Sequence, residues 1–212
     1  MKKARIAVLV SGGGTNLQAL IDAQMRGELG GGEIVAVISS KEGAYALQRG
    51  AKVGIPGYVI PRKQFDSNRA MTVALVEKLK ELEIDLVVLA GCMVIFTNEL
   101  VEAYPNAVMN VHPALIPSFC GEGFYGLHVH EAALAYGVKL SGATVHFVSE
   151  ECDGGPIIAQ KAVPVMENDT PETLQHRIME QAEWKLLPEA VSLFCQGRLS
   201  VNGRTVIIKE KD

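Results

Sequence analysis

Cysteine is scarce in this sequence, and its placement excludes two kinds of site. The 212 residues contain four cysteines, Cys92, Cys120, Cys152 and Cys195. They form no Cys-x-x-Cys pair, and no histidine stands at metal-ligand spacing from any of them. A zinc knuckle and a paired redox site are therefore unsupported, and no metal is expected. Scattered free thiols are typical of a protein in a reducing cytosol.

Long apolar runs and an excess of one charge are also missing. No stretch approaches the roughly 18 apolar residues of a membrane span. The first apolar run, Ile6 to Val10, ends after five residues at a glycine-rich sequence, which favours a strand over a signal peptide. The 20 basic and 24 acidic side chains give a net charge of −4, which offers no general attraction to nucleic acid or to an anionic membrane. We expect a cytoplasmic protein whose partners are small molecules.

The sequence does contain a regular alternation of apolar runs and helical patterns. Strand-like runs at 6–10, 34–39, 84–90 and 107–111 alternate with helical patterns at 16–25, 44–53 and 67–82. The run at 84–90 is too continuous for a half-exposed strand, so it requires cover on both faces, as in a parallel sheet. The sequence predicts one domain, residues 1–212, with an open, mostly parallel, doubly wound (Rossmann-like) α/β sheet and helices on both faces.

The alternation of strand and helix patterns changes in the second half of the chain. After a loop at 113–126 and a helix at 127–136, strands at 142–148 and 156–165 flank an Asp-Gly-Gly turn and predict a hairpin. Thr170 followed by Pro171 is a helix start. We expect that helix to end near Glu183, a second helix to run from Pro188 to Gln196, and a short strand at 205–208 to close the fold.

A glycine-rich loop is the first chemical signal. Gly12, Gly13 and Gly14 stand between the first strand and the first helix, followed by Thr15 and Asn16. Glycines allow a ligand to approach the backbone, and the helix start directs free N–H groups at the same point. The spacing matches neither the dinucleotide motif nor the lysine-bearing phosphate loop, so a single phosphate is favoured. The alternative interpretation is a tight turn that needs glycine for its backbone angles.

Three polar residues have the side-chain types needed for acyl transfer. Asn110 and His112 end an apolar run and project to the same side of a strand, and Asp153 lies in the Asp-Gly-Gly turn. A carboxamide can polarise a carbonyl, an imidazole can move a proton, and a carboxylate can hold the imidazole in its working state. A partly buried structural histidine and an ordinary turn aspartate are the alternatives.

Four motifs occur in a recognisable order: Ser-Gly-Gly-Gly-Thr-Asn-Leu-Gln from residue 11, Asn-Val-His-Pro-Ala-Leu-Ile-Pro from 110, Gly-Ala-Thr-Val-His-Phe-Val from 142 and Asp-Gly-Gly-Pro-Ile-Ile from 153. From Ile6 to about Phe194 the chain resembles the folate-dependent phosphoribosylglycinamide formyltransferases (glycinamide ribonucleotide transformylases). The resemblance implies an enzyme of de novo purine biosynthesis that transfers a formyl group from 10-formyltetrahydrofolate to the amine of glycinamide ribonucleotide.

The resemblance also implies roles for individual residues. Asn110, His112 and Asp153 fall on the catalytic trio, and residues 1–105 and 106–212 become the nucleotide-binding half and the catalytic, folate-binding half. The ribonucleotide positions are Gly12, Gly13, Gly14, Thr15, Asn16 and Glu183, and the folate positions are Met93, Val94, Ile95, Phe96, Phe147 and Val148. In the implied mechanism Asn110 and a protonated His112 stabilise the oxyanion, while Asp153 raises the proton affinity of His112 and orders a water that relays a proton.

The chain departs from that family at several positions. Asn68 stands where many members carry an arginine that contacts substrate, and Arg69 follows it, rotated by about 100° on a helix; Arg62 or Lys63 are candidate replacements. Val94 also replaces a common arginine. The loop 118–126 is longer than the family's shortest form, and it is either a flap or a packed surface loop. His128 and His130 are two apart, so on a helix they face apart and are expected to be structural.

Three other functions are alternatives. Formyltetrahydrofolate deformylase shares the trio but has an additional N-terminal regulatory domain, and methionyl-tRNA formyltransferase has an additional C-terminal RNA-binding domain; neither extension is apparent in this sequence. A non-enzymatic nucleotide-binding module would use the glycine loop and would not need Asn110, His112 or Asp153. A monomer and a homodimer are equally compatible with the sequence.

Overall fold

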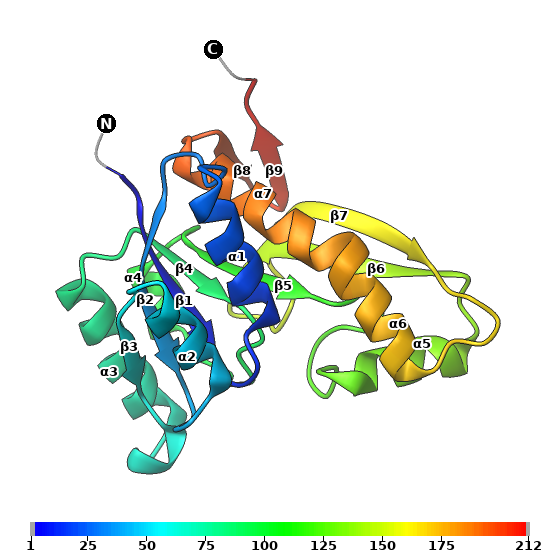
Figure 1. Ribbon diagram of the computed structural model, residues 1–212, viewed down its shortest axis with the longest axis horizontal. Helices are drawn as coiled ribbons and strands as arrows, with labels where there is room; N and C mark the ends of the chain where they lie inside the picture. Colours follow the sequence, from blue (N-terminus) through cyan, green and yellow to red (C-terminus); the bar gives the residue numbers. More distant parts are fainter. Residues whose placement is uncertain (1–2, 211–212) are drawn as a thin grey trace.

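The computed structural model describes residues 3–210 and contains one mixed sheet (Figure 1). Its nine strands are ordered β3-β2-β1-β4-β5-β6-β7-β9-β8. The strands are β1 (Arg5–Val10), β2 (Glu33–Ser39), β3 (Gly57–Val59), β4 (Leu86–Leu89), β5 (Val108–His112), β6 (Leu140–Phe147), β7 (Ile157–Pro164), β8 (Leu199–Asn202) and β9 (Thr205–Ile208). The first five in sheet order are parallel, and β6 pairs antiparallel with both β5 and β7.

Helices cover both faces of the parallel part, as the sequence predicts. The helices in order are α1 (Thr15–Met25), α2 (Tyr45–Lys52), α3 (Asn68–Glu81), α4 (Glu99–Ala103), α5 (Leu127–Tyr136), α6 (Pro171–Ile178) and α7 (Trp184–Cys195), of which α5 and α6 pack against the antiparallel strands instead. Ile6, Val8 and Val10 of β1 join one core with α1, α2 and α7. Ala7 and Leu9, on the opposite face, join a second core with α3 and α4. This two-sided burial explains the continuous apolar runs and confirms the doubly wound fold.

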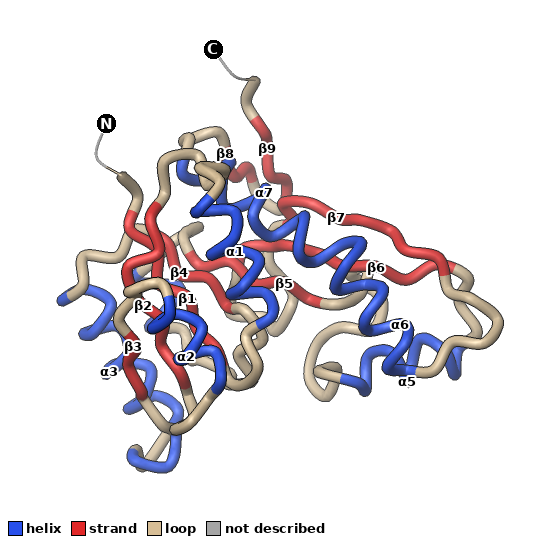
Figure 2. Tube along the Cα trace, viewed as in Figure 1, coloured by secondary structure: helices blue, strands red, loops and turns tan. Residues whose placement is uncertain are grey.

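The antiparallel strands extend the sheet beyond the parallel part. Figure 2 shows the β6–β7 hairpin projecting away from β1–β5, with α5 and α6 near its far end. A third core forms there from Ala133 of α5, Ala143 of β6, and Leu174 and Ile178 of α6. The hairpin carries the turn that contains Asp153 back to β5, because Phe147 at the end of β6 pairs with Met109.

The predicted break between two C-terminal helices is wrong. Thr170 caps α6 with Pro171 at its first position, as predicted, but the helix passes through a π-helical turn, Met179–Glu183, directly into α7. Pro188 lies inside α7 and is buried. A proline inside a helix removes one backbone N–H donor. Here the backbone hydrogen-bonding pattern already changes in the π-helical turn just before it, so the helix continues through Pro188.

Several short elements are absent from the sequence-based prediction. These are β3, α4 and β8, together with a single 3₁₀ turn at Arg62–Gln64. Each has five residues or fewer, which is too short for a hydrophobic period to appear. Within residues 3–210, no helix combines the length and apolarity that crossing a membrane requires.

Candidate active site

The candidate site lies at the carboxyl ends of the parallel strands, where open α/β sheets bind ligands. The glycine loop follows β1, and the segment 91–96 follows β4. Asn110 and His112 occupy the last part of β5, and Asp153 comes from the turn between β6 and β7. Four segments that are far apart in the sequence therefore meet at one edge of the sheet.

The structure brings the three predicted catalytic side chains into contact. Asn110 Nδ2 donates a hydrogen bond to Asp153 Oδ1 at 3.3 Å, and His112 Nδ1 lies 3.5 Å from Asp153 Oδ2. The side chains of His112 and Asp153 are 5% and 10% exposed. A carboxylate this well buried against an imidazole and an amide is not an ordinary turn aspartate.

The ionisation of the pair differs from the sequence-based expectation. Burial raises the pKa of Asp153, but its neighbours, among them His112 and the Gly121 N–H, outweigh it and hold this pKa below its ordinary value. Burial lowers the pKa of His112, and the opposing effects of Asp153 and the Phe119 carbonyl do not restore it. At neutral pH these two shifts favour an ionised Asp153 beside a neutral His112, whereas the sequence led us to expect a protonated imidazole.

Sequence reasoning missed three groups that contact the trio. The Phe119 carbonyl oxygen accepts a hydrogen bond from His112 Nε2 at 2.8 Å, and the Gly121 N–H donates to Asp153 Oδ2 at 3.0 Å. His146 Nε2 lies 3.3 Å from Asn110 Nδ2 and 3.6 Å from Asp153 Oδ1. The two backbone groups leave no sequence signal, but His146 stands in the Gly-Ala-Thr-Val-His-Phe-Val motif and is a polar residue in an apolar strand.

The three glycines of the loop have different roles. Gly14 has a left-handed backbone (φ 72°), and a Cβ there would lie 2.6 Å from Ala46 Cβ, so this position requires glycine. A Cβ on Gly12 or Gly13 would meet nothing within 4 Å. The Gly13 carbonyl oxygen accepts from Arg49 Nε at 2.8 Å, which brings a cation to the loop, and no side chain caps the N-terminus of α1. Gly14 is thus a structural turn residue, while the adjacent backbone is open to an anion.

Substitution in this loop should separate stability from ligand binding. Gly14→Ala is expected to lower the free energy of unfolding by about 1–3 kcal/mol, because it combines a left-handed backbone with overpacking. Gly12→Ala is the matched control and should leave the melting temperature unchanged, while raising KM for a phosphorylated substrate. Thermal melts and steady-state kinetics of both variants test this, and equal melting temperatures would contradict the assignment of Gly14.

Asn16 and Glu183, which are far apart in the sequence, are in contact through their side chains. Asn16 Nδ2 donates to Glu183 Oε2 at 2.6 Å, and both residues are buried. Burial raises the pKa of Glu183 to about 7. Asn16 Oδ1 is buried, and no described residue forms a hydrogen bond with it. The π-helical turn places Glu183 in this position, and such turns are frequent at functional sites.

Glu183 should make stability depend on pH. Its carboxyl group keeps a proton in the folded state between its ordinary pKa of 4.5 and about 7, whereas the unfolded chain loses that proton, so folding becomes less favourable as pH rises through this window. Glu183→Gln keeps an acceptor for Asn16 but does not titrate. Its free energy of unfolding should match that of wild type near pH 5 and exceed it by on the order of 2–3 kcal/mol at pH 8. Glu180→Gln, exposed in the same turn, is the control. An equal difference at both pH values in chemical denaturation would contradict this.

The predicted folate residues divide into exposed and buried groups. Met93 and Ile95 are 56% and 59% exposed, and Val94, Phe96 and Val148 are half-buried. Phe147 is 1% exposed in the core, and its N–H and carbonyl pair with Pro156 and His146. A ligand can therefore reach Val148 and the segment 93–96 but not the Phe147 side chain.

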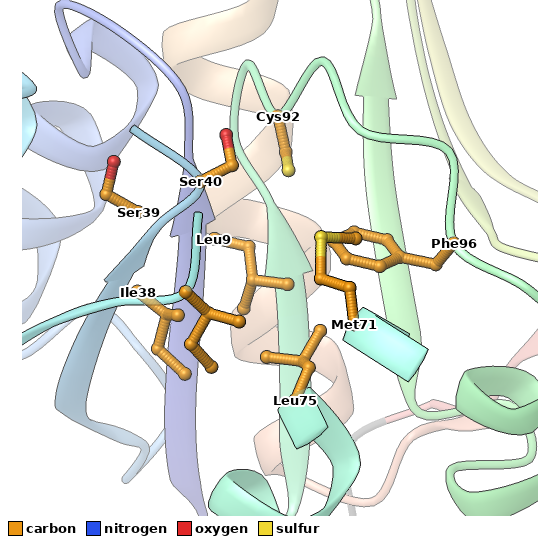
Figure 3. Close-up of a pocket in the computed structure, with 9 residues that line it drawn as sticks. Leu9, Ile38, Ser39, Ser40, Met71, Leu75, Cys92 and Phe96 are labelled. Atoms are coloured by element: carbon orange, nitrogen blue, oxygen red, sulfur yellow. The ribbon is translucent and has the colours of Figure 1, made fainter. Parts of the chain in front are cut away.

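The segment after β4 also borders a small apolar pocket, shown in Figure 3. It is lined by Cys92 and Phe96 of this segment and by Met71 and Leu75 of α3, among other residues (Figure 3). Ser11 Oγ accepts a hydrogen bond from the Met93 N–H at 2.8 Å, which fixes the segment against the loop after β1. The side chains of Met93 and Ile95 are thereby left facing outward.

The candidate replacements for the missing arginine occupy different environments. Arg69 Nε lies 2.5 Å from Glu99 Oε1, so this cation is already paired. Arg62 donates to Asn68 Oδ1, and Asn68 Nδ2 donates to the Ile95 carbonyl at 3.3 Å. Lys63 is exposed. Of the three cations, Arg62 is the one connected by hydrogen bonds to the segment 93–96.

The loop 118–126 is packed in this structure. The Phe119 ring makes edge contacts with Phe124 and Tyr136, at centroid distances of 6.4 and 6.0 Å. On α5, His128 is exposed beside Glu131, while His130 is fully buried; burial lowers the pKa of His130 to about 4. The two histidines face apart, as predicted. No group of three or more His, Cys, Asp or Glu side chains within residues 3–210 is arranged to hold a metal ion.

Known proteins resemble this chain over most of its length. The family model for formyl transferase matches residues 4–191. The chain belongs to the formyl transferase family. The phosphoribosylglycinamide formyltransferase of Haemophilus influenzae is 39% identical over 211 residues, which cover 100% of this chain and 95% of that protein. The crystal structure of glycinamide ribonucleotide transformylase 1 from Symbiobacterium toebii has a TM-score of 0.92 and 42% identity, covering 98% of this chain and 95% of that one. The resemblance inferred from the four motifs is thereby confirmed.

This formyl transferase also resembles a protein named for a different reaction and a protein that is much longer. A formyltetrahydrofolate deformylase from Pseudomonas syringae matches with a TM-score of 0.86 and 28% identity, covering 99% of this chain and 67% of that one. The chain spans about a fifth of the trifunctional purine biosynthetic protein adenosine-3 of Bos taurus, 20% of its length, at 44% identity. The fold is therefore shared by enzymes that do different things with a formyl group.

Proposed function

We propose that this formyl transferase moves a formyl group from 10-formyltetrahydrofolate to the amine of glycinamide ribonucleotide. The products are formylglycinamide ribonucleotide and tetrahydrofolate, in a step of de novo purine biosynthesis. The observation that carries the proposal is the contact of both Asn110 and His112 with Asp153, between an open glycine loop and an exposed apolar segment.

The reaction sets three requirements. The amine attacks the formyl carbon, and the bond from that carbon to N10 of the folate later breaks. In between, the formyl oxygen carries negative charge, the amine must lose a proton, and N10 must gain one. Donors aimed at the oxygen and a base within reach of the amine are the groups that accelerate such a reaction.

The trio can meet these requirements with Asp153 ionised and His112 neutral. Asp153, ionised at neutral pH, accepts the proton of the attacking amine, directly or through water, and returns it to N10. Asn110 donates an amide N–H to the formyl oxygen. The Phe119 carbonyl accepts from His112 Nε2, so this nitrogen carries a hydrogen and is the second donor. For that donor to reach substrate, the Phe119 carbonyl must move aside, so part of the loop 118–126 shifts in the catalytic cycle.

The binding partners follow from the surroundings of the trio. The phosphate of the ribonucleotide is assigned to Gly12, Gly13 and the N-terminus of α1 beside Arg49, with Asn16 and Glu183 facing the sugar. The folate is assigned to the exposed segment 93–96 and to Val148. Position 68 holds Asn68 where many family members have an arginine. Arg62, which is hydrogen-bonded to Asn68, supplies a cation for the carboxylates of the folate's glutamate tail instead.

The second candidate function is hydrolysis of the same folate. It is favoured by the similarity to the Pseudomonas syringae deformylase, which covers 99% of this chain. Water would then take the place of the amine at the same trio, and the glycine loop and the Asn16–Glu183 pair would have no substrate to hold. A nucleotide-binding module without catalysis is disfavoured, because it gains nothing from a buried carboxylate beside His112.

An absorbance assay of folate product with and without glycinamide ribonucleotide distinguishes these functions. Wild type should form product only when the ribonucleotide is present, and the unphosphorylated glycinamide riboside should be a poor substrate. Equal product formation without the ribonucleotide would identify a hydrolase. No product under any condition would rule out both enzymatic functions.

A further inference from the structure

His146 is a buried titratable residue for which the reaction described above has no use. It lies near the end of β6, directly opposite Asn110 of β5 in the antiparallel pair, so the two side chains lie on the same face of the sheet. It is 1% exposed. The pairing of β6 with β7 shifts register between Val145 and His146, and such irregularities commonly re-aim a side chain beside an active site.

The contacts of the ring determine which nitrogen carries hydrogen. His146 Nδ1 lies 2.8 Å from the Phe147 carbonyl oxygen. A carbonyl oxygen only accepts, so Nδ1 is the protonated nitrogen, and in the neutral ring Nε2 presents a lone pair. That lone pair faces Asn110 Nδ2 at 3.3 Å. Asp153 Oδ1, at 3.6 Å from Nε2, lies beyond hydrogen-bonding distance.

These contacts also determine which end of the Asn110 amide faces the site. An amide can place either its N–H₂ or its oxygen toward a neighbour, and the two orientations have nearly the same shape. Here two acceptors, His146 Nε2 and Asp153 Oδ1, both lie 3.3 Å from the same nitrogen. Asp153 changes its protonation during the proposed reaction, so His146 is the acceptor that persists throughout the cycle.

We infer that His146 is a positioning residue that holds the N–H₂ end of Asn110 toward the reacting carbonyl. One amide hydrogen stays on His146 Nε2, and the other is released from Asp153 to the formyl oxygen. Without the histidine acceptor, the amide can turn its own oxygen toward the developing negative charge and repel it. This inference rests on the proposed function, because it assigns Asn110 as a donor to the formyl oxygen.

Two substitutions distinguish the roles of the two ring nitrogens of His146. His146→Asn retains a donor near Nδ1 for the Phe147 carbonyl but is too short to reach Asn110. His146→Gln retains an acceptor near Nε2. We expect His146→Asn to lower kcat by about 10- to 100-fold, part of the loss from removing a carbonyl donor. KM for the ribonucleotide should change by less than about threefold, and His146→Gln should keep kcat within about fivefold of wild type.

A double-mutant cycle with Asn110→Ala tests whether His146 acts through Asn110. Once Asn110 is gone, His146→Asn should change kcat by less than about threefold, because there is no amide left to orient. Equal losses in the two backgrounds, or an equal loss for Gln and Asn, would overturn the inference. If His146→Asn does not fold, His146→Leu replaces it in the cycle with the same expected outcomes.

The same kinetic assay distinguishes failure of the proposed function from failure of the inference about His146. Wild-type enzyme that produces no formylated ribonucleotide would refute the proposed function, and the inference with it. Active wild-type enzyme with a fully active, folded His146→Asn variant would refute the inference alone.

Discussion

Asp153→Asn is expected to lower kcat by about 10²- to 10⁴-fold while leaving the fold intact, because it removes the ionised base that contacts both other members of the trio. The amide keeps an acceptor for the Gly121 N–H, which holds the turn in place. It loses the negative charge that faces His112 and the capacity to take a proton from the amine.

Kinetics and thermal melts of Asp153→Asn test this expectation against a control in the same turn. Glu151→Gln changes an exposed carboxylate two residues away and should retain wild-type kcat. Near wild-type turnover in Asp153→Asn would remove this residue from the mechanism. A collapse of the melting temperature would show instead that the carboxylate mainly maintains the fold.

His112→Ala is expected to lower kcat by about 10²- to 10³-fold, the usual cost of removing one donor to a developing oxyanion. KM for either substrate should change much less, because the imidazole acts on charge that appears only as the reaction proceeds. His128→Ala, at an exposed position on α5, is the matched control. A loss that appears mainly in KM would assign His112 to substrate binding rather than to the transition state.

The fold was predictable where sequence periodicity and local signals agree. The apolar residues of β1 face two different cores, so their unbroken run in the sequence already indicates a buried parallel strand. Thr170 and Pro171 mark a helix start through local chemistry alone. Pro188 misled the prediction, because whether a proline ends a helix depends on the hydrogen-bonding register upstream of it.

The candidate site was predictable in its residue types but not in its electrostatics. Asn110, His112 and Asp153 carry a recognisable pattern, and their convergence follows from the strand ends. The lowered pKa of His112 depends on its burial in the folded chain, and no single residue encodes that burial. His146 was overlooked because an isolated histidine in an apolar strand is usually structural, and only its pairing with Asn110 distinguishes it.

The fate of the formyl group tests the central claim most directly. Incubation of the enzyme with ¹³C-formyl-labelled 10-formyltetrahydrofolate, followed by NMR, reports whether the label enters the ribonucleotide amide or formate. We predict label in formylglycinamide ribonucleotide alone when the ribonucleotide is present, and no loss of label from the folate when it is absent. Release of labelled formate at a comparable rate without the ribonucleotide would contradict formyl transfer to an amine and identify water as the acceptor.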